Sequence, residues 1–588
     1  MADINGDSPE LVDTGSGLSL RYKGKWLYSQ RAPVSRAIAI LESTALEEEC
    51  LYLVPSPCLC YGLTELASRL PASSSILAVE TDETLFTLAQ ESLRARIAAS
   101  AGQGRTSTET APDNRLIAKN GLIIIDSVNG TRTALLHYRS DEALFSAVNN
   151  LGKFRRVSEV RLSSGWTLAA DIYGALPAKI LEYFSEYYRS RMTAVRMGRL
   201  WLRNTIKNLL RLPENPVTVP ATDKPVLVCG AGISLYRTLP WIREERENLY
   251  ILACDTAFGT LRAAGIRPDS IVCLDAQLYN MLDLIGYAEH PREHKEATRT
   301  DFAPMHAFVD ISAHPSFFLG FTENITPVLT LWSKSRFMQD LASSGYGFLT
   351  LPPLGSVGLS SLFLAGKFKS PAIFLTGLDF AFVSGHTHAP STLMDASEFQ
   401  RETRLYRRGN SWAHSFREGS RTITPGWRSD PALEMYASLC RELVASLQAE
   451  HRLVDLRGEI GIHLGLDRHE GAELGDLLRL IQETSNAAGP TTLSATADSQ
   501  TADTPRVSAE ALRCILKDAY KNITILRQEL RGGSDRGSLL ERIRELDFLF
   551  IHFPDSERVL ALEQDSLNRL ALECDYWTSF MEKELGRF

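Results

Sequence analysis

Short apolar runs alternate with helical stretches through the middle of the chain, from residue 221 to residue 480. This alternation predicts an α/β fold in which a mainly parallel sheet carries helices on both faces. Ligands of such sheets bind beyond the carboxyl ends of the strands, so the residues that follow each run are the first candidates for function. The predicted strands are Val226–Cys229, Tyr250–Cys254, Ile271–Leu274, Ala307–Ile311, Val328–Leu331 and Ala372–Leu375.

A smaller strand–helix–strand pattern precedes this region and predicts an N-terminal α/β unit of degenerate Rossmann-like type. Its strands are Leu51–Val54 and Ile76–Glu80, and Asp82 follows the second, where nucleotide folds carry a ribose-binding acid. The loop after the first strand has Gly62 as its single glycine, so the phosphate-cradling glycines are missing. We therefore interpret the unit as structural rather than cofactor-binding.

The last hundred residues change character twice. Residues 484–507 are rich in Ser, Thr, Ala and Pro, which predicts a flexible linker. From 508 the apolar residues return at helical spacing, which predicts a helical hairpin or three-helix appendage. The predicted domains are 1–215, a central domain over 216–483, the linker 484–507 and a C-terminal helical domain over 508–588.

Composition narrows the class of protein. A chain of 588 residues with net charge −8 is not expected to bind nucleic acid generally. An odd number of cysteines, nine, without paired metal spacing argues against a disulfide framework. The polar start of the chain resembles no secretory signal, and no apolar run approaches the ~18–20 residues of a membrane span. We expect a cytoplasmic protein.

The first candidate for chemistry is a glycine turn after the first central strand. Gly230, Ala231 and Gly232 lead into a helix near Ser234. Glycines permit a close approach of the backbone to a ligand, and a helix N-terminus attracts phosphate. Ser234 is expected to cap the helix and to offer its hydroxyl. A tight turn without a ligand is the alternative.

Polar residues follow two further strands at the same predicted edge. Asp255 and Thr256 end the second strand, and Asp275 ends the third. Such acceptors suit the ribose hydroxyls of a nucleotide or an acceptor hydroxyl, although a single acid of this kind is commonly a helix cap. Gly355 and Ser356 precede an apolar helix, which predicts a second helix N-terminus facing a phosphate or carboxylate.

The segment after the last predicted strand brings an acid and two histidines. Asp379 follows the strand, and His386 and His388 come shortly after. No further His or Cys nearby completes a convincing set of zinc ligands, which disfavours a metal at these histidines. Imidazole titrates near neutrality, which suits a general base or a hydrogen-bond donor, and a plain loop histidine is the alternative.

Taken together and in order, these motifs resemble the central domain of the motility-associated factor (Maf) flagellin glycosyltransferases. The resemblance is strong over about residues 221–465 and does not cover the tail from 484. Ile233 and Phe380 depart from the family pattern. The matching segments are Gly230–Leu235, Asp255–Thr256, Gly265–Asp269, Leu274–Asp275, Gly355–Val357, Gly377–Ala381 and Thr387–Ala389, with Leu453–Asp455 and Gly458–Ile462 as a degenerate closing strand and loop.

The resemblance implies a sialyltransferase-like α/β fold and a CMP-activated nonulosonic acid, such as CMP-pseudaminic or CMP-legionaminic acid, as donor. It implies Ser or Thr hydroxyls of flagellin as acceptors, and neither a metal nor a cofactor. His388 is implied as the base that takes the acceptor proton, with His386 second. The glycine turn and Ser356 would hold the phosphate or the donor carboxylate, and Asp255 and Asp275 would hold ribose, cytosine or acceptor groups.

Two other functions remain open at this stage. The same domain is similar to an archaeal hydroxymethylpterin diphosphokinase, in which Asp255, Asp275 and Asp379 would hold Mg²⁺ for ATP. The other is a non-catalytic flagellin-binding assembly factor. Arg401–Arg408 with Trp412 is interpreted as a solvated basic run, with an acceptor-contacting loop as the alternative.

Overall fold

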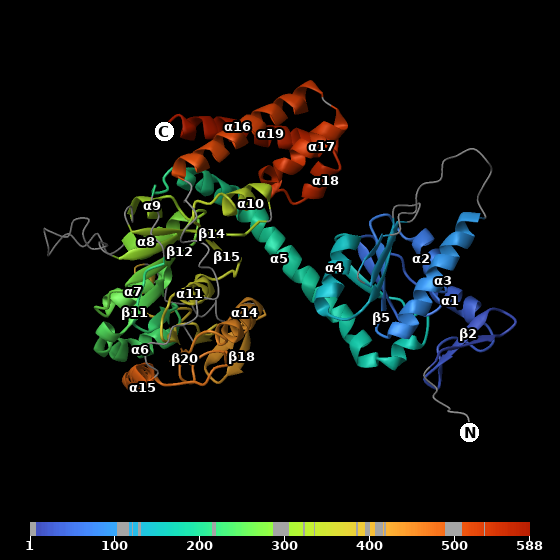
Figure 1. The fold of residues 1–588 in the computed structure, drawn as a ribbon, viewed down its shortest axis with the longest axis horizontal. Helices are drawn as coiled ribbons and strands as arrows, with labels where there is room; N and C mark the ends of the chain where they lie inside the picture. Colours follow the sequence, from blue (N-terminus) through green and yellow to red (C-terminus); the bar gives the residue numbers. More distant parts are fainter. Residues whose placement is uncertain are drawn as a thin grey trace. The chain divides into compact units, whose positions relative to one another are not determined.

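The computed structural model of the chain divides into two compact units, Met1–Met192 and Thr193–Phe588 (Figure 1). The border falls inside helix α5, Ala170–Leu209, whereas the sequence placed a boundary at residue 215. The reason is that the end of α5 buries Leu202, Ile206 and Leu209 in the core of the second unit. The structure describes residues 8–587 apart from 103–116, 120, 127–130, 215–218, 286–304, 321–323, 334, 384–385, 394–399, 401, 406–415, 417–418, 488–507 and 534.

The first unit holds a six-stranded sheet of order β6-β7-β8-β5-β4-β9. Its β4, β5, β8 and β9 are parallel, while β7 runs antiparallel to β8 and to β6. A separate antiparallel sheet, β1-β2-β3, precedes it. The strands are β1 Glu10–Asp13, β2 Leu18–Tyr22, β3 Lys25–Trp26, β4 Cys50–Pro55, β5 Ser75–Glu80, β6 Ile117–Lys119, β7 Leu122–Asp126, β8 Arg132–His137 and β9 Arg156–Glu159, and the helices before α5 are α1 Pro33–Glu42, α2 Leu63–Arg69, α3 Glu83–Gly102 and α4 Asp141–Leu151.

Side chains fill the crevice at the strand-order reversal of this sheet, between β4 and β9. Glu80 is buried there and accepts hydrogen bonds from the hydroxyls of Ser56 (2.8 Å) and Tyr173 (2.9 Å). A Cβ added to Gly165 would overlap with the hydroxyl of Ser56. Reversal points of this kind bind nucleotides in Rossmann folds, but here a hydrogen-bonded network of the chain's own residues occupies the position.

The second unit is built on an eight-stranded parallel sheet of order β15-β14-β13-β12-β11-β10-β16-β20 (Figure 1). All six strands predicted from the apolar runs are present within a few residues of their expected bounds, and the α/β fold class is confirmed. The short edge strand β15 was not predicted. The strands are β10 Val226–Cys229, β11 Tyr250–Cys254, β12 Ser270–Cys273, β13 His306–Asp310, β14 Ile325–Thr330, β15 Leu349–Leu351, β16 Ile373–Thr376 and β20 Leu453–Asp455.

Helices cover both faces of this sheet because successive strand residues point to opposite sides. Val226 and Val228 pack into one core with α11 (Val357–Ala365) and α14 (Pro431–Leu447). Leu227 and Cys229 pack into another core. On that second face lie α6 Ile233–Glu244, α7 Asp255–Ala263 and α15 Leu474–Ala487. A small antiparallel sheet of order β17-β19-β18 follows β16, with β17 at Phe382–Val383, β18 at Arg421–Thr424 and β19 at Trp427–Ser429.

The C-terminal helices belong to the same unit as the sheet. Their apolar residues, among them Trp577 and Leu516, share one core with strands β12 to β14 and with the end of α5. The predicted C-terminal helices are thus present, and they pack against the side of the sheet formed by β12 to β14, where Phe258 of α7 belongs to the same core. The helices are α16 Ala509–Gly532, α17 Arg536–Glu545, α18 Ser556–Leu560 and α19 Gln564–Leu585. Of the predicted linker, 484–487 form the end of α15 and 488–507 lie outside the described residues.

Candidate functional site

The strand order of the large sheet reverses between β10 and β16, and the loops after these two strands pack backbone against backbone. The N–H of Gly230 donates to the carbonyl of Thr376 (2.9 Å), and that of Gly232 donates to the carbonyl of Gly377 (2.8 Å). A Cβ added to Gly377, whose φ is +72°, would overlap with the carbonyl oxygen of Gly230. The glycines of the predicted turn are thus required by a close approach of two loops. Their N–H groups are already engaged by the chain.

Asp379 closes this turn from the other loop. Its carboxylate accepts the backbone N–H of Ser234 (2.9 Å) and the Ser234 hydroxyl (2.5 Å), and that hydroxyl accepts the N–H of Gly377 (2.8 Å). Burial raises the pKa of Asp379, while Arg457 and the bonds from Ser234 act in the opposite direction. The expectation that Ser234 caps α6 was wrong, because Gly232 is the cap residue and the Ser234 side chain bonds across to Asp379. The carboxylate supplies the anion that a helix N-terminus attracts.

A buried ion pair that the sequence analysis missed holds the Asp379 loop in place. Arg457 and Asp455 are both buried and form a two-point contact of 2.8 and 2.9 Å. Arg457 also donates to the carbonyl of Leu378 (2.7 Å), and the N–H of Ile462 donates to the carbonyl of Asp379 (2.9 Å). The closing segment Gly458–Ile462 therefore fastens the loop. An arginine two residues after an acid that ends a strand was the available signal.

Three carboxylates gather where β11 and β12 end. Asp255 is fully buried, and its Oδ1 accepts the N–H of Thr256 (2.8 Å). Asp283 lies on α8 (Leu278–Ile285) and is also buried, and Asp275 is half-buried with its Oδ1 bonded to the N–H of Gln277 (2.8 Å). Burial and the neighbouring carboxylates, Asp283 first, raise the pKa of Asp255 to about 7. Burial raises the pKa of Asp283 to about 6. The sequence analysis named Asp255 and Asp275 but not Asp283.

The segment Ala389–Leu393, here called the strap, joins this acid group to the glycine turn. The N–H of Ala389 donates to the carbonyl of Ala231 (2.8 Å), and the hydroxyl of Thr260 on α7 donates to the carbonyl of Pro390 (2.7 Å). The backbone of Leu393 donates to Asp283. The strap is thus bonded to the turn before α6, to α7 and to α8.

The two predicted histidines lie directly before the strap. The N–H of His386 donates to the carbonyl of Val383 (2.8 Å), and Nδ1 of His388 lies 3.2 Å from the hydroxyl of Thr387. Both rings are half-buried. Because Ala389 is bonded to Ala231, His388 lies next to the glycine turn. Gly385, residues 401 and 406–408 of the basic run, and Trp412 lie outside the described residues.

Helix α11 begins at the same edge, as expected for the Gly355–Ser356 motif. Ser356 is its N-cap residue and makes no capping bond with its side chain. Gly355 has a φ of +72°, which favours glycine, and a Cβ at Gly358 would overlap with the side chain of Leu378 from the Asp379 loop. Since α11 packs under β10 to β12, its N-terminus lies below the carboxyl ends of these strands.

Helix α5 fixes the turns after β12 and β13, which the sequence analysis also missed. The amide of Asn208 donates to the carbonyls of Ile311 and Ala313, both at 2.8 Å, and that of Asn204 donates to the carbonyl of Ala276 (3.0 Å). Both asparagines are buried. Two asparagines four residues apart on one helix face, among apolar neighbours, were the available signal.

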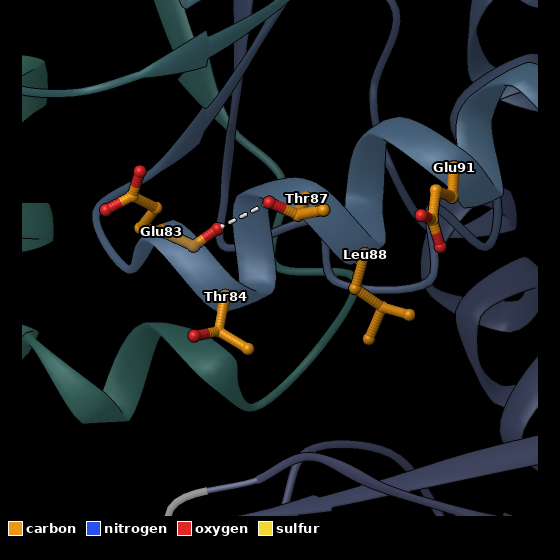
Figure 2. Close-up of a pocket in the computed structure, with 5 residues that line it drawn as sticks. All are labelled: Glu83, Thr84, Thr87, Leu88 and Glu91. Carbon is orange, nitrogen blue, oxygen red and sulfur yellow. Dashed lines mark hydrogen bonds between the residues drawn. The ribbon is translucent and has the colours of Figure 1, made fainter.

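One hollow in the first unit has no relation to these motifs. It has a volume of about 490 Å³ and lies against helix α3. Figure 2 shows its side chains along that single helix, with the hydroxyl of Thr87 donating to the carbonyl of Glu83 (3.0 Å). The residues that line it, two acids, two threonines and a leucine, all come from one helix, so the hollow carries no argument about activity.

The predicted site residues therefore come together at one edge of one sheet. Hydrogen bonds or packing connect the glycine turn, Ser234 and Asp379 with the strap, and the strap with the carboxylate group that holds Asp255. No helix among the described residues is both long and apolar enough to cross a membrane. Nor does any group of three or more His, Cys, Asp or Glu in the described part of the chain have the arrangement of a metal site.

Comparisons with known proteins agree with this architecture. Residues 202–385 match the model of the family "6-hydroxymethylpterin diphosphokinase MptE-like". An uncharacterized protein of Treponema pallidum (strain Nichols) is 26% identical over 99% of this chain and 97% of its own length. A second protein of that organism is 35% identical over 100 residues, which is 16% of this chain and 44% of that protein.

A solved structure is similar over nearly the whole chain. The Maf glycosyltransferase from Magnetospirillum magneticum AMB-1 aligns with a TM-score of 0.54 and 12% sequence identity, over 99% of this chain and 91% of that one. At this identity the likeness concerns the fold. The chain thus combines an MptE-like segment with the chain-long fold of a Maf glycosyltransferase, and the resemblance predicted from its motifs is confirmed.

Proposed function

We propose that the chain is a glycosyltransferase that transfers a nonulosonic acid of the pseudaminic or legionaminic type from a CMP-activated donor to Ser or Thr residues of flagellin. One observation carries the proposal. The motifs that resemble the Maf family gather at the strand-order reversal of a sheet whose fold matches a Maf glycosyltransferase along the whole chain. Ligands of parallel α/β sheets bind at such a reversal.

The geometry divides the predicted residues into two groups. Hydrogen bonds join the loop after β10, which carries Gly230, Gly232 and Ser234, to the loop after β16, which carries Asp379. We therefore assign these residues to building the turn rather than to holding the donor phosphate. Ser356 has no side-chain capping bond, and the N-terminus of α11 lies under the strand ends. We therefore assign the donor phosphate or carboxylate to the start of α11.

The remaining predicted residues follow β11 and β12 or precede the strap. Asp255 and Asp275 follow β11 and β12 and offer carboxylate oxygens for hydroxyl groups of the ribose or the acceptor. Thr256 stands beside them, and His388 is adjacent to the glycine turn. In the reaction the acceptor oxygen attacks the anomeric carbon, CMP departs with the bonding electrons of its phosphate oxygen, and the acceptor proton passes to a base.

Flagellin mass gives the direct test. Intact-mass comparison of flagellin from the parent strain and from a strain lacking this protein should show the loss of a nonulosonic acid mass, and adding back the gene should restore it. With purified protein, CMP should raise the melting temperature and ATP should not. Ser356→Ala should weaken the effect of CMP, whereas Ser343→Ala, at an exposed helix end, should not. Unchanged flagellin mass in the deletion strain would refute the proposal.

A diphosphokinase of the hydroxymethylpterin type is the second candidate, because residues 202–385 match that family model. It would use Asp255, Asp275 and Asp379 together to hold Mg²⁺. However, Asp379 lies between Ser234 and Arg457, whereas the charges that act on Asp255 are Asp283 and Asp275. Transfer of diphosphate from ATP to 6-hydroxymethylpterin by the purified chain would favour this candidate over glycosyl transfer.

A further inference from the structure

Asp255 has an oxygen that its surroundings leave unbonded. The side chain is 0% exposed, and no donor among the described residues lies within hydrogen-bond distance of Oδ2. Its other oxygen is bonded to Thr256. Buried carboxylates without partners are rare because an unpaired buried polar group costs free energy. Glu573 among the C-terminal helices also has a buried oxygen without a donor. Asp310 and Asp379, however, lie like Asp255 at the carboxyl ends of strands of the large sheet and are bonded at both oxygens, so the unbonded oxygen of Asp255 at this edge indicates a function.

The charged groups around Asp255 favour its protonated form. Asp283 faces it from α8 and Asp275 from the end of β12, and the thiols of Cys254 and Cys273 lie at the ends of β11 and β12. Like charges and burial both oppose ionisation, so the carboxyl changes its protonation near neutral pH. A general base works best when it titrates near the operating pH.

The carboxyl of Asp255 also lies close to the strand-order reversal of the large sheet. It begins α7, directly after β11, beside the strand that ends in the glycine turn. The strap that bonds to the carbonyl of Ala231 also bonds to Thr260 of the same helix. Asp283, which faces Asp255, accepts the N–H of Leu393 at the end of the strap. A substrate at the strand-order reversal would therefore lie next to the group that carries the unbonded oxygen.

We propose that Oδ2 of Asp255 takes the proton of the acceptor hydroxyl, and that Asp283 is a positioning residue that acts through it. This inference rests on the proposed glycosyl transfer. The acceptor O–H bond breaks and its proton moves to Oδ2, while the oxygen's electron pair forms the bond to the anomeric carbon. The bond from that carbon to the phosphate oxygen breaks, and CMP leaves with the electron pair. Asp255 then releases the proton to water. In this scheme His388 contacts the donor and does not take the acceptor proton.

The test uses the full-length chain with flagellin and CMP-pseudaminic or CMP-legionaminic acid, followed by intact mass between pH 5 and pH 9. Asp255→Asn should lower kcat by about 10²-fold or more and keep the stabilisation by CMP, since a positioned base contributes ~10²–10⁴-fold. Asp283→Asn should move the acidic limb of the pH profile to lower pH, because removing a like charge lowers the pKa of Asp255.

Asp547→Asn is the matched control. Burial raises the pKa of Asp547 to about 6, but this residue lies among the C-terminal helices, so both rate and pH profile should remain those of the wild type. His388→Gln should retain the acidic limb. The proposal is overturned by Asp255→Asn activity within about threefold of wild type, by loss of the limb in His388→Gln, or by an unmoved limb in Asp283→Asn.

These outcomes separate the two proposals. If the wild-type chain transfers neither sugar, the glycosyltransferase function fails and the role of Asp255 fails with it. If the wild type transfers sugar and Asp255→Asn does so equally well, the role of Asp255 fails while the function stands. Should Asp255→Asn not fold, the Asp283→Asn profile decides, because that protein keeps Asp255.

Discussion

Replacing Asp255 with asparagine should change how the stability of the protein depends on pH, whatever the function of the protein is. The pKa of this carboxyl is about 7 in the folded chain and 3.8 ordinarily. The folded state therefore binds the proton more tightly than the unfolded state. Its stability falls as pH rises from about 4 to about 7, and it is constant above that range. Asparagine cannot ionise, so the variant lacks this decline.

The size of the effect follows from the shift. Between pH 5 and the folded pKa of about 7, the wild type loses about 2–3 kcal/mol at ~1.36 kcal/mol per pH unit. An unfolding entropy of ~2.1 cal/mol/K per residue gives ~0.8 kcal/mol/K for a unit of about 400 residues. The decline in melting temperature between pH 5 and pH 8 should therefore be smaller by about 3 °C in the variant than in the wild type.

Scanning calorimetry at pH 5, 6, 7 and 8 measures this difference. Comparing slopes rather than single temperatures removes the constant cost or gain of placing an amide at the buried position. Asp518→Asn, at an exposed position of α16, is the control and should follow the wild type at every pH. A variant at Asp255 whose melting temperature declines with pH as steeply as that of the wild type would refute the titration on which the argument depends.

Three further substitutions test the architecture of the site. Gly377→Ala should prevent correct folding, because the added methyl overlaps with the carbonyl of Gly230 at a positive φ; normal expression and thermal stability would contradict the close packing of the two loops. Arg457→Met should cost ~3–5 kcal/mol in denaturant unfolding, since it leaves Asp455 charged and buried without a partner, and a loss below ~1 kcal/mol would argue against the ion pair. Asn208→Ala should cost ~1–3 kcal/mol, because two buried carbonyls after β13 lose their donor, and hydrogen exchange should rise in that turn if the contact is real.

The sequence by itself determined the sheet and the edge at which chemistry was expected. Runs such as Tyr250–Cys254 are short and apolar at almost every position, as in a strand covered on both faces, and their alternation with helical stretches indicated the fold class. Since parallel strands end at one edge, the motifs after them were expected there, and the strap and the glycine turn after β10 meet at that edge.

Only the tertiary structure decided what each residue bonds to. Ser234 and Asp379 are 145 residues apart, and their pairing depends on β10 and β16 becoming neighbours. The same holds for Arg457, which contacts the loop after β16 because β20 adds to that side. Asp283 carried no motif, since its effect on Asp255 comes from the packing of α7 against α8. Local pattern fixes which residues are buried, whereas long-range strand order decides which buried polar groups meet.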